Sequence, residues 1–387
     1  MSRLIKETAH DKVIYLFSSA PPDRPTYKRG VLNILCYPAG HQLELSYQKS
    51  YLQPPLFEEA PKLANRKGVF VFLDYKASGK DHEFIPIRFV TILDVAPKET
   101  ATRYLDTTRV HVRIQLGDLI LHDASWNSEV GSLPGRPKVY EGASTASRGY
   151  FYVVEGRNLF PEHSDLSQRD IWDQITGKVA NAKSLNDCVF LSTGHLRPFK
   201  DASPCTLEPY GAEQKAYQLE PNTLYRLDLR VYYPRASSDR EIIVRSSSEL
   251  LSVSQPFATA HGAEDHSVLI ACKRTIESTL ATLAIDVGAK NLPAGSSQNF
   301  GPLPVSSEVV AAKPRYLLSI EPSKMIVRGF VFLIFLGFLL TSTSKEFYSD
   351  FICSPEPVAV LSKTIGAICL AWAGYLAFRK LPSGGSA

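Results

Sequence analysis

The sequence of 387 residues lacks the motifs that mark the common cofactor and metal sites. It contains no Walker A loop, no G-x-G-x-x-G fingerprint and no H-E-x-x-H motif. Its six cysteines are scattered, without a C-x-x-C pair or a Cys/His spacing that would hold zinc. We therefore expect free thiols, no metal ion and no bound cofactor, and the sequence singles out no catalytic or cofactor-binding residue.

The chain also lacks blocks of like charge. It holds 43 Lys and Arg against 39 Asp and Glu, a net charge of +4, and the two signs are interspersed. Dispersed basic residues argue against a nucleic-acid partner, because such a partner needs a basic patch or stripe. The first twelve residues contain no apolar stretch typical of a signal peptide, so we expect the main body to be cytosolic.

Long hydrophobic runs are concentrated in the last seventy residues. Two apolar stretches, Met325–Leu340 and Pro357–Phe378, are separated by a polar run over 341–350. The first stretch is apolar on every side, which is typical of a helix in a large core or in a bilayer. A membrane-spanning helix needs roughly 20 mostly apolar residues. The sequence therefore predicts a two-helix transmembrane hairpin over 322–380, with a buried hairpin of a soluble domain as the alternative.

Two basic residues within this hairpin are candidates for a membrane function, Arg328 and Lys363. An ionised residue near the middle of a span costs about 2.5–3.5 kcal/mol and marks a functional site by default. Ordinary snorkelling of a long side chain to the interface is the alternative. Basic residues flank the hairpin and acidic residues lie in its loop, so we expect both termini on the cytoplasmic side. Small residues in the second helix would let the backbones approach closely. They are Gly366, Ala367, Ala371, Ala373 and Gly374.

The first region, 1–135, has the signals of a β-barrel or β-sandwich. Arg109–Leu116 alternates strictly between apolar and polar residues, as a half-buried strand does. Val31–Tyr37 and Leu43–Tyr47 flank turn residues and predict a β-hairpin. Pro86 interrupts an apolar run, which predicts a strand that starts late, lies at an edge or carries a bulge.

The remaining body divides into a connecting region, 136–213, and a second β-domain, 214–321. An amphipathic helix is predicted after Ser167 in the connecting region, because a capping residue precedes a helical apolar period. Leu224–Tyr232 alternates cleanly, and turns recur about every ten residues, a pattern typical of an immunoglobulin-like sandwich. A flexible tail, 381–387, ends the chain. The predicted fold is therefore mainly β, with two antiparallel domains before the hairpin.

Four short polar stretches bring imidazoles, carboxylates or a serine together in the sequence. They are Asp81–His82, His122–Asp123, Gly142–Ser147 and His261–His266. Adjacent residues on a strand point to opposite faces, and a five-residue histidine spacing fits neither a strand nor a helix. Gly142–Ser147 lacks the second glycine of a nucleophile elbow. We therefore interpret all four as solvated loops in preference to catalytic or metal sites.

These features predict a membrane-tethered, cytosolic, β-rich recognition or sensor protein. Its partners would be the lipid bilayer, a cytosolic protein or small ligand, and possible further copies of itself. The layout of a sensing body with a minimal two-helix membrane element is similar to that of bacterial membrane-acting immunity effectors, whose hairpins perturb the membrane on activation. The alternatives are a passive scaffold that recruits a cytosolic partner and a hydrolase at the membrane surface. A non-enzymatic role is favoured.

Overall fold

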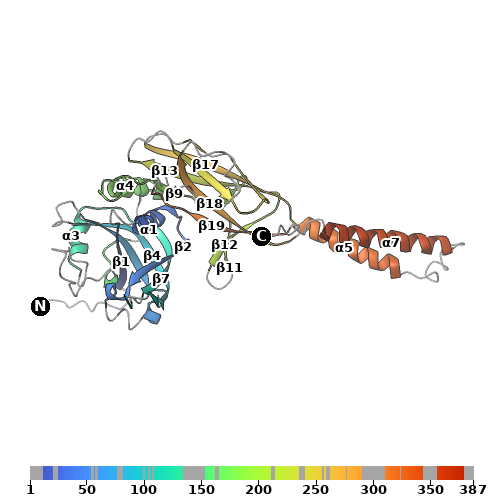
Figure 1. The fold of residues 1–387 in the computed structure, drawn as a ribbon, viewed down its shortest axis with the longest axis horizontal. Coiled ribbons are helices and arrows are strands. Elements are labelled where there is room, and N and C mark those ends of the chain that lie inside the picture. Colours follow the sequence, from blue (N-terminus) through green and yellow to red (C-terminus); the bar gives the residue numbers. More distant parts are fainter. Residues whose placement is uncertain are drawn as a thin grey trace.

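A computed structural model describes most of the chain between Lys12 and Phe378 (Figure 1). The residues outside this description are 1–11, 21–24, 54–55, 57–59, 76–81, 99–100, 103–104, 107–108, 134–152, 162–164, 211–213, 235–239, 255–256, 259–261, 276, 290–309, 323, 343–354 and 379–387. Strands account for 47% of the structure, so the predicted mainly β class is confirmed. The described α-helices are α1 (Pro25–Cys36), α3 (Ser125–Gly131), α4 (Gln168–Ala180), α5 (Lys324–Ser342) and α7 (Pro355–Phe378). Two 3₁₀ turns are η2 (Lys49–Tyr51) and η3 (Ala60–Leu63).

The first part of the body is a single open sheet of six strands. In spatial order they are β2 (Gln42–Gln48), β7 (Arg109–Leu119), β4 (His82–Lys98), β3 (Lys67–Tyr75), β1 (Lys12–Ser19) and β8 (Val153–Arg157). The strands pair antiparallel except for β1 and β3, which run parallel. A parallel pair needs a long crossover, and the chain supplies one through α1 and β2. The sheet is open, with β2 and β8 at its edges, so the prediction of an antiparallel barrel or sandwich was wrong for this region.

Both faces of this sheet are covered, which accounts for its most apolar strands. Alternate residues of β1 contact two different buried clusters: Ile14 and Leu16 lie in one, Tyr15 and Phe17 in the other. The first cluster includes α1 and α4, and the second includes residues of α3. A strand buried on both faces reads as a continuous hydrophobic run rather than as an alternating one. That is the pattern over 13–17.

The predicted β-hairpin around residue 38 is wrong, because Val31–Cys36 belongs to α1. Pro25 lies at the first helical position, where its missing N–H costs nothing. Val31, Leu32 and Leu35 then recur with helical spacing and are buried against the sheet. A short run of this kind fits either period, and only the contact with the sheet decided for the helix.

Other local predictions are confirmed. Pro86 lies where the β3–β4 register shifts, so it occupies a bulge. In β7, Val110, Val112, Ile114 and Leu116 alternate inward as expected. The predicted amphipathic helix is α4, and its N-cap is Ser167, whose hydroxyl accepts a hydrogen bond from the backbone N–H of residue 170 at 3.2 Å.

The second part of the body consists of two sheets packed face to face. One contains β10 (Arg197–Pro198), β13 (Leu224–Tyr233), β17 (Gly262–Cys272) and β15 (Leu251–Val253), with β9 (Phe190–Thr193) also paired to β13. The other contains β11 (Leu207–Tyr210), β12 (Gln214–Leu219), β19 (Arg315–Ile320), β18 (Thr279–Ala289), β14 (Arg240–Ser246) and β16 (Phe257–Ala258). A small ribbon, β5 (Ala101–Thr102) with β6 (Leu105–Asp106), stands apart. The inward residues of both large sheets share one buried cluster, so this region is a sandwich. Its β12–β19 pair is parallel, a departure from the antiparallel pattern expected for 214–321.

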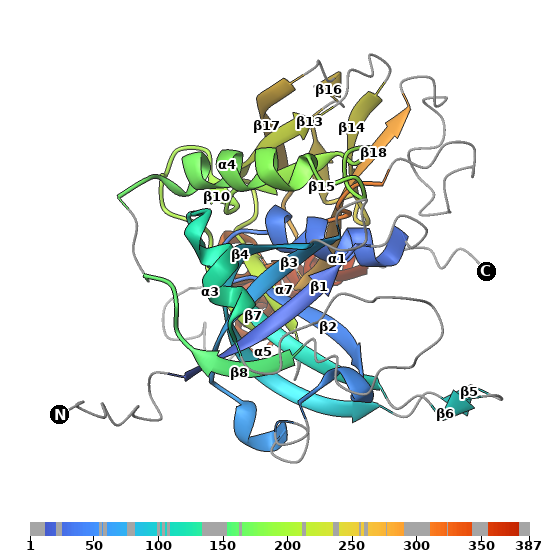
Figure 2. The ribbon, with the colours of Figure 1, turned by 90° about the vertical axis from the view of Figure 1, so that its left-hand side faces the viewer.

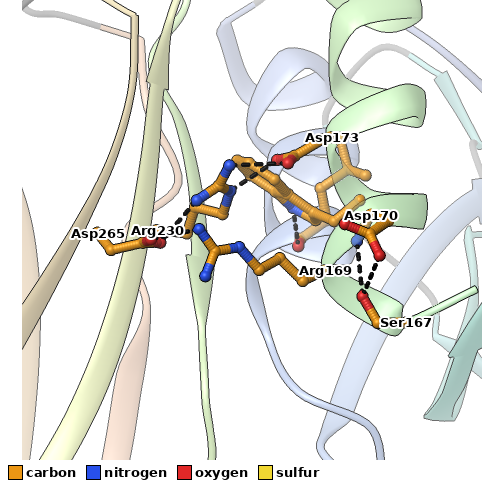
Figure 3. Close-up of polar contacts among 8 residues, drawn as sticks. Ser167, Arg169, Asp170, Asp173, Arg230 and Asp265 are labelled. Atoms are coloured by element: carbon orange, nitrogen blue, oxygen red, sulfur yellow. Dashed lines mark hydrogen bonds and ion pairs between the residues drawn. The ribbon is translucent and has the colours of Figure 1, made fainter.

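Helix α4 is clamped to the sandwich by a chain of ion pairs (Figure 3). Arg230 of β13 donates two hydrogen bonds to Asp173 of α4, at 2.6 and 2.7 Å. Its third nitrogen contacts Asp265 of β17 at 2.7 Å, and Arg169 reaches the other oxygen of Asp265 at 2.5 Å. On its other side, α4 buries Trp172, whose ring N–H donates to the carbonyl of residue 35 at 3.0 Å. The connecting helix therefore joins the open sheet to the sandwich.

One buried cluster extends from Ile14 in the open sheet to Ile320 at the end of β19, so the two parts of the body share a core. Beyond Ile320, α5 and α7 form a helical hairpin that projects away from this body (Figure 1). A view from the opposite end shows the sandwich and the open sheet stacked on each other (Figure 2). Among the residues that the structure describes, no helix is both long enough and apolar enough to cross a membrane.

Candidate functional site

The α5–α7 hairpin buries small residues between its helices and exposes many of its large apolar residues. Its buried positions in α7 are Ala359, Ser362, Gly366 and Ala373, which face α5 at helical spacing. Its large exposed side chains are Val331, Phe332, Phe335, Phe338, Leu339, Val360, Leu361, Ile365, Ile368 and Trp372. These are ten of the fourteen large hydrophobic side chains that are exposed in the described part of the chain. A contiguous apolar surface of this kind marks an interaction site with a protein or a membrane.

Two glycines allow the close contact between the helices. A Cβ at Gly337 would lie 2.6 Å from the Leu370 side chain, and a Cβ at Gly366 would lie 2.9 Å from the Gly337 carbonyl. No ordinary side chain fits at such distances, so any larger residue would push the helices apart. The Ser362 hydroxyl donates to the carbonyl of Leu340 at 3.2 Å across the same interface. Small residues and interhelical hydroxyl bonds are the means by which helices associate within lipid.

Hydroxyl groups on the hairpin are also satisfied by the helices themselves. The Thr341 hydroxyl donates to the Gly337 carbonyl at 2.8 Å, and the Thr364 hydroxyl donates to the Val360 carbonyl at 2.8 Å. Such bonds remove the need for water at these side chains. The polar atoms of Thr341 and Thr364 are therefore compatible with an apolar surrounding.

The structure does not bring Arg328 and Lys363 together. Arg328 is exposed near the beginning of α5, whereas Lys363 is exposed beside Ser362, which contacts Leu340. Leu340 lies twelve residues after Arg328, which is roughly 18 Å along the helix at 1.5 Å per residue. The two basic groups therefore lie at different depths of the hairpin and act as separate candidates.

A second polar cluster lies within the body, where the open sheet meets the sandwich. The Thr193 hydroxyl of β9 donates to the Cys36 carbonyl at 3.0 Å and contacts the Tyr316 hydroxyl of β19. The Tyr37 hydroxyl accepts the backbone N–H of Arg315 at 2.8 Å. The His41 ring stacks on Tyr37 with centroids 3.9 Å apart. Hydrogen bonds and rings thus tie the end of α1 to the strand that leads into the hairpin.

Arg88 completes this junction by binding the end of α1. Its guanidinium is buried and donates to the carbonyls of Ile34 and Tyr37 at 2.9 and 2.6 Å. A cation at a helix C-terminus is stabilised by the helix dipole and by the free carbonyls there. Burial lowers the pKa of Arg88 to about 10, so the side chain remains charged at neutral pH.

The ionisable groups of the junction do not form a nucleophile and its base. Burial raises the pKa of the Cys36 thiol to about 12, which keeps it protonated and unreactive. Burial, and then the nearby charge of Arg88, lowers the pKa of His41 to about 4. The Nδ1 atom of His41 has no hydrogen-bond partner among the described residues, so no carboxylate orients this ring through that atom. We interpret the junction as a structural joint.

The polar stretches singled out in the sequence remain apart. The Asp123 carboxylate accepts the backbone N–H of Ser125 at 2.9 Å, while both ring nitrogens of His122 lack partners among the described residues. The side chains of Asp265 and His266 have different partners. Asp265 forms ion pairs with Arg169 and Arg230, whereas His266 contacts Glu264 at 3.3 Å. No group of three metal-binding side chains occurs within the described ranges. Asp81, Gly142–Ser147 and His261 lie outside the described residues, as do the side-chain contacts of His82.

Sequence reasoning missed the roles of three hairpin residues. Gly337 had a visible signal, because it lies within an otherwise bulky apolar segment. For Ser362 and Ala359, the only indication in the sequence was their helical spacing to Gly366, which places the three residues on one face of the helix. Among the predicted small residues, Gly366 and Ala373 face α5 as expected, whereas Ala367 and Ala371 point outward.

No protein-family model matches this sequence, and no curated protein matches it either.

Proposed function

We propose that the chain is a membrane-tethered recognition protein whose α5–α7 hairpin inserts into a lipid bilayer. One observation carries this proposal: the hairpin exposes ten large apolar side chains, while the positions buried between its helices are small residues. In water this arrangement is unfavourable, because the exposed side chains gain no free energy from burial. Each large apolar side chain contributes roughly 1.5–3 kcal/mol when it leaves water. In lipid the same arrangement is the favourable one, because packing between small residues holds the helices together.

The proposed recognition role of the body is supported by the way its two parts are joined to each other and to the hairpin. The open sheet and the sandwich share one core, and α5 begins at Lys324, four residues after the end of β19 at Ile320. A partner that binds the body would therefore act on a unit that is continuous with the hairpin. The proposed partners are a cytosolic protein or small ligand, the bilayer and further copies of the chain, with both termini in the cytoplasm.

Insertion is tested by partition of the full-length chain into phosphatidylcholine vesicles. The variant Phe335→Asp replaces a side chain that is 65% exposed on the hairpin. A charged residue there is expected to lower the bound fraction strongly, since Asp within a membrane helix costs about 2.5–3.5 kcal/mol. The matched control is Leu166→Asp, which alters an exposed apolar residue at the other end of the body, beside the N-cap of α4. Equal partition of the two variants and the parent chain would refute insertion of the hairpin.

The crossing of the bilayer is tested separately with Cys353, which lies between α5 and α7 in the sequence. If both helices cross, a membrane-impermeant maleimide should label Cys353 in intact cells, and the Cys353→Ser variant should lose this labelling. Labelling only after lysis would show that the loop does not reach the far side. The hairpin would then be an inserted element that does not span the bilayer.

Release of a vesicle-entrapped dye distinguishes an effector from an anchor. If the hairpin perturbs the membrane, the inserted chain should release dye, and Lys363→Leu should reduce that release without reducing partition. Unchanged release by Lys363→Leu would remove this lysine from the mechanism. If the chain inserts but releases no dye, even when a partner is bound to the body, the hairpin is an anchor. The chain would then be a passive scaffold that recruits its partner to the membrane.

A further inference from the structure

Apart from the hairpin, the described part of the chain exposes only four large apolar side chains, and three of them lie at one end of the body. The four are Leu166, Phe199, Leu224 and Leu280. Leu166 precedes the N-cap of α4, a helix that Figure 1 shows on the side of the body away from the hairpin. The other three lie at the end of the sandwich from which α5 departs, as the strand pairing shows.

Leu224 and Phe199 are neighbours at this end. Leu224 is the first residue of β13, and the turn before it follows Leu219, the last residue of β12. The Leu219 carbonyl accepts the backbone N–H of Glu321, the residue after β19, at 3.0 Å. The backbone N–H of Phe199 donates to the Leu224 carbonyl at 2.8 Å. Both apolar side chains therefore lie close to the point where the chain leaves the sandwich for the hairpin.

Leu280 lies at the same end on the second sheet. It pairs with Ser319, which precedes the last residue of β19. Its neighbour Ala281 is buried in the core, so Leu280 projects from the outer face of the sandwich. Leu224 likewise projects outward, since the next residue, Tyr225, is buried. The exposed apolar residues therefore flank the exit point on both sheets.

The link between the sandwich and the hairpin is short. Glu321 is held to β12 by its backbone bond, and α5 begins at Lys324. Three Cα–Cα steps of 3.8 Å span at most about 11 Å. If the hairpin is in a bilayer, this end of the sandwich must then lie at the bilayer surface.

We propose that Phe199, Leu224 and Leu280, which lie on both sheets around the exit of the hairpin, form a rim, here called the docking face, that enters the interfacial layer of the bilayer. This inference rests on the proposed insertion of the hairpin and adds a second, independent contact between the body and the lipid. The docking face fixes how the body stands on the membrane, and so which of its surfaces a cytosolic partner can reach.

The charges around the docking face identify the lipid chemistry. On the sandwich itself, the exposed basic and acidic side chains around these residues are balanced, Lys200, Lys273 and Arg274 against Asp201, Glu220 and Glu277, whereas the exposed Arg328 belongs to α5. A surface that recognises acidic headgroups carries an excess of Lys and Arg. The partner is therefore the apolar and glycerol region of a neutral phosphatidylcholine bilayer, and the contact should persist at high salt.

Tryptophan fluorescence in vesicles of brominated phosphatidylcholine tests the docking face, because bromine quenches indoles that contact the acyl chains. Trp372 on α7 reports hairpin insertion in the parent chain, since Trp172 is buried in the body and Trp126 lies in the cluster around α3. In a Trp372→Phe background, Phe199→Trp should lose emission in brominated vesicles relative to unbrominated ones. The matched variant Leu166→Trp, in the same background, should emit equally in both.

The outcomes separate this inference from the proposed function. Quenching of Trp372 without quenching of Phe199→Trp would overturn the docking face and leave insertion intact. Absence of Trp372 quenching would overturn insertion, and the docking face with it. If Phe199→Trp emission changes with protein concentration and not with bromination, a second copy of the chain covers this face and the lipid contact is wrong. If high salt abolishes the quenching of Phe199→Trp, the contact depends on charge, and the proposed apolar contact is wrong.

Discussion

The body and the hairpin of this protein use the same apolar residue types in opposite places. In the body, the largest side chains are the most deeply buried, among them Trp172, Tyr15 and Phe70. In the hairpin, Phe335 and Trp372 face outward, while the positions buried between the helices are small residues. This difference is the one that our proposal of an inserted hairpin predicts. Water drives large apolar groups inward, whereas lipid leaves packing of small residues to hold helices together.

The two regions also treat polar groups differently. The body encloses Arg88, Thr193 and Tyr316 in a junction where carbonyls and hydroxyls serve as partners. The hairpin returns its hydroxyls to its own helix carbonyls or, at Ser362, to the neighbouring helix. The polar partners in the body come from distant segments, whereas those in the hairpin lie on the same or the neighbouring helix. Three predictions would break or sharpen this comparison.

The largest effect is expected from exchanging the two tryptophans for alanine. Trp172→Ala should lower the free energy of unfolding of the body by about 4 kcal/mol, because it leaves a cavity and an unpaired carbonyl at the end of α1. Trp372→Ala should change this free energy by less than about 0.5 kcal/mol, as exposed positions usually do. Urea unfolding in nanodiscs, followed by near-ultraviolet circular dichroism, measures both. If the two variants lower the free energy of unfolding by similar amounts, Trp372 is not an exposed side chain and the contrast between body and hairpin is wrong.

A pH dependence of about 3 kcal/mol is expected from the half-buried His41. Its pKa is lowered to about 4 in the folded protein, against about 6.5 in an unfolded chain. The folded state therefore binds fewer protons in this window, and stability falls as the pH is lowered from 6.5 to 4, by at most about 3 kcal/mol.

The variant His41→Phe keeps a ring on Tyr37 and removes the titrating group. It should reduce the slope of stability against pH between 6.5 and 4, as measured by urea unfolding at a series of pH values. His195, whose pKa is also lowered by burial and by Arg88, would account for part of the remaining slope. An unaltered slope in His41→Phe would show that this ring is not neutral in the folded state.

The smallest effect is expected at the glycines of the hairpin. Gly337→Val should weaken the pairing of α5 with α7 by about 2 kcal/mol, the usual cost of overpacking. Gly329→Val is the matched control, because a Cβ at Gly329 meets nothing within 4 Å. The rate of disulfide formation between Leu340→Cys and Ser362→Cys measures the pairing, with Cys353 and Cys369 replaced by serine. Equal rates in the two valine variants would show that close approach at Gly337 is not needed.

Much of the local structure could be predicted from the sequence. Strict alternation identified β7 and β13, and a capping serine before a helical period identified α4. The apolar segments near the end of the chain were correctly predicted as helices. Each of these signals is local, because it depends on the spacing of apolar residues within one element. The hairpin was recognisable as a candidate site for the same reason.

Other features depended on contacts between distant residues. Val31–Tyr37 fits a strand as well as a helix, and the sheet that it packs against decided for α1. The parallel β1–β3 pair, and with it the open sheet in place of a barrel, follows from a crossover that no local pattern reports. The separation of Arg328 from Lys363 likewise required the register between α5 and α7.

By itself, the sequence determined the mainly β class of the body, the amphipathic α4 and the helical nature of its two C-terminal apolar segments. It did so because secondary structure follows from the periodicity of side chains along one segment. The tertiary structure alone decided which residues of the hairpin face outward, and it alone brought Phe199, Leu224 and Leu280 to the end where α5 begins. Strand pairing and helix packing set these positions, since they act between segments that are far apart in the chain.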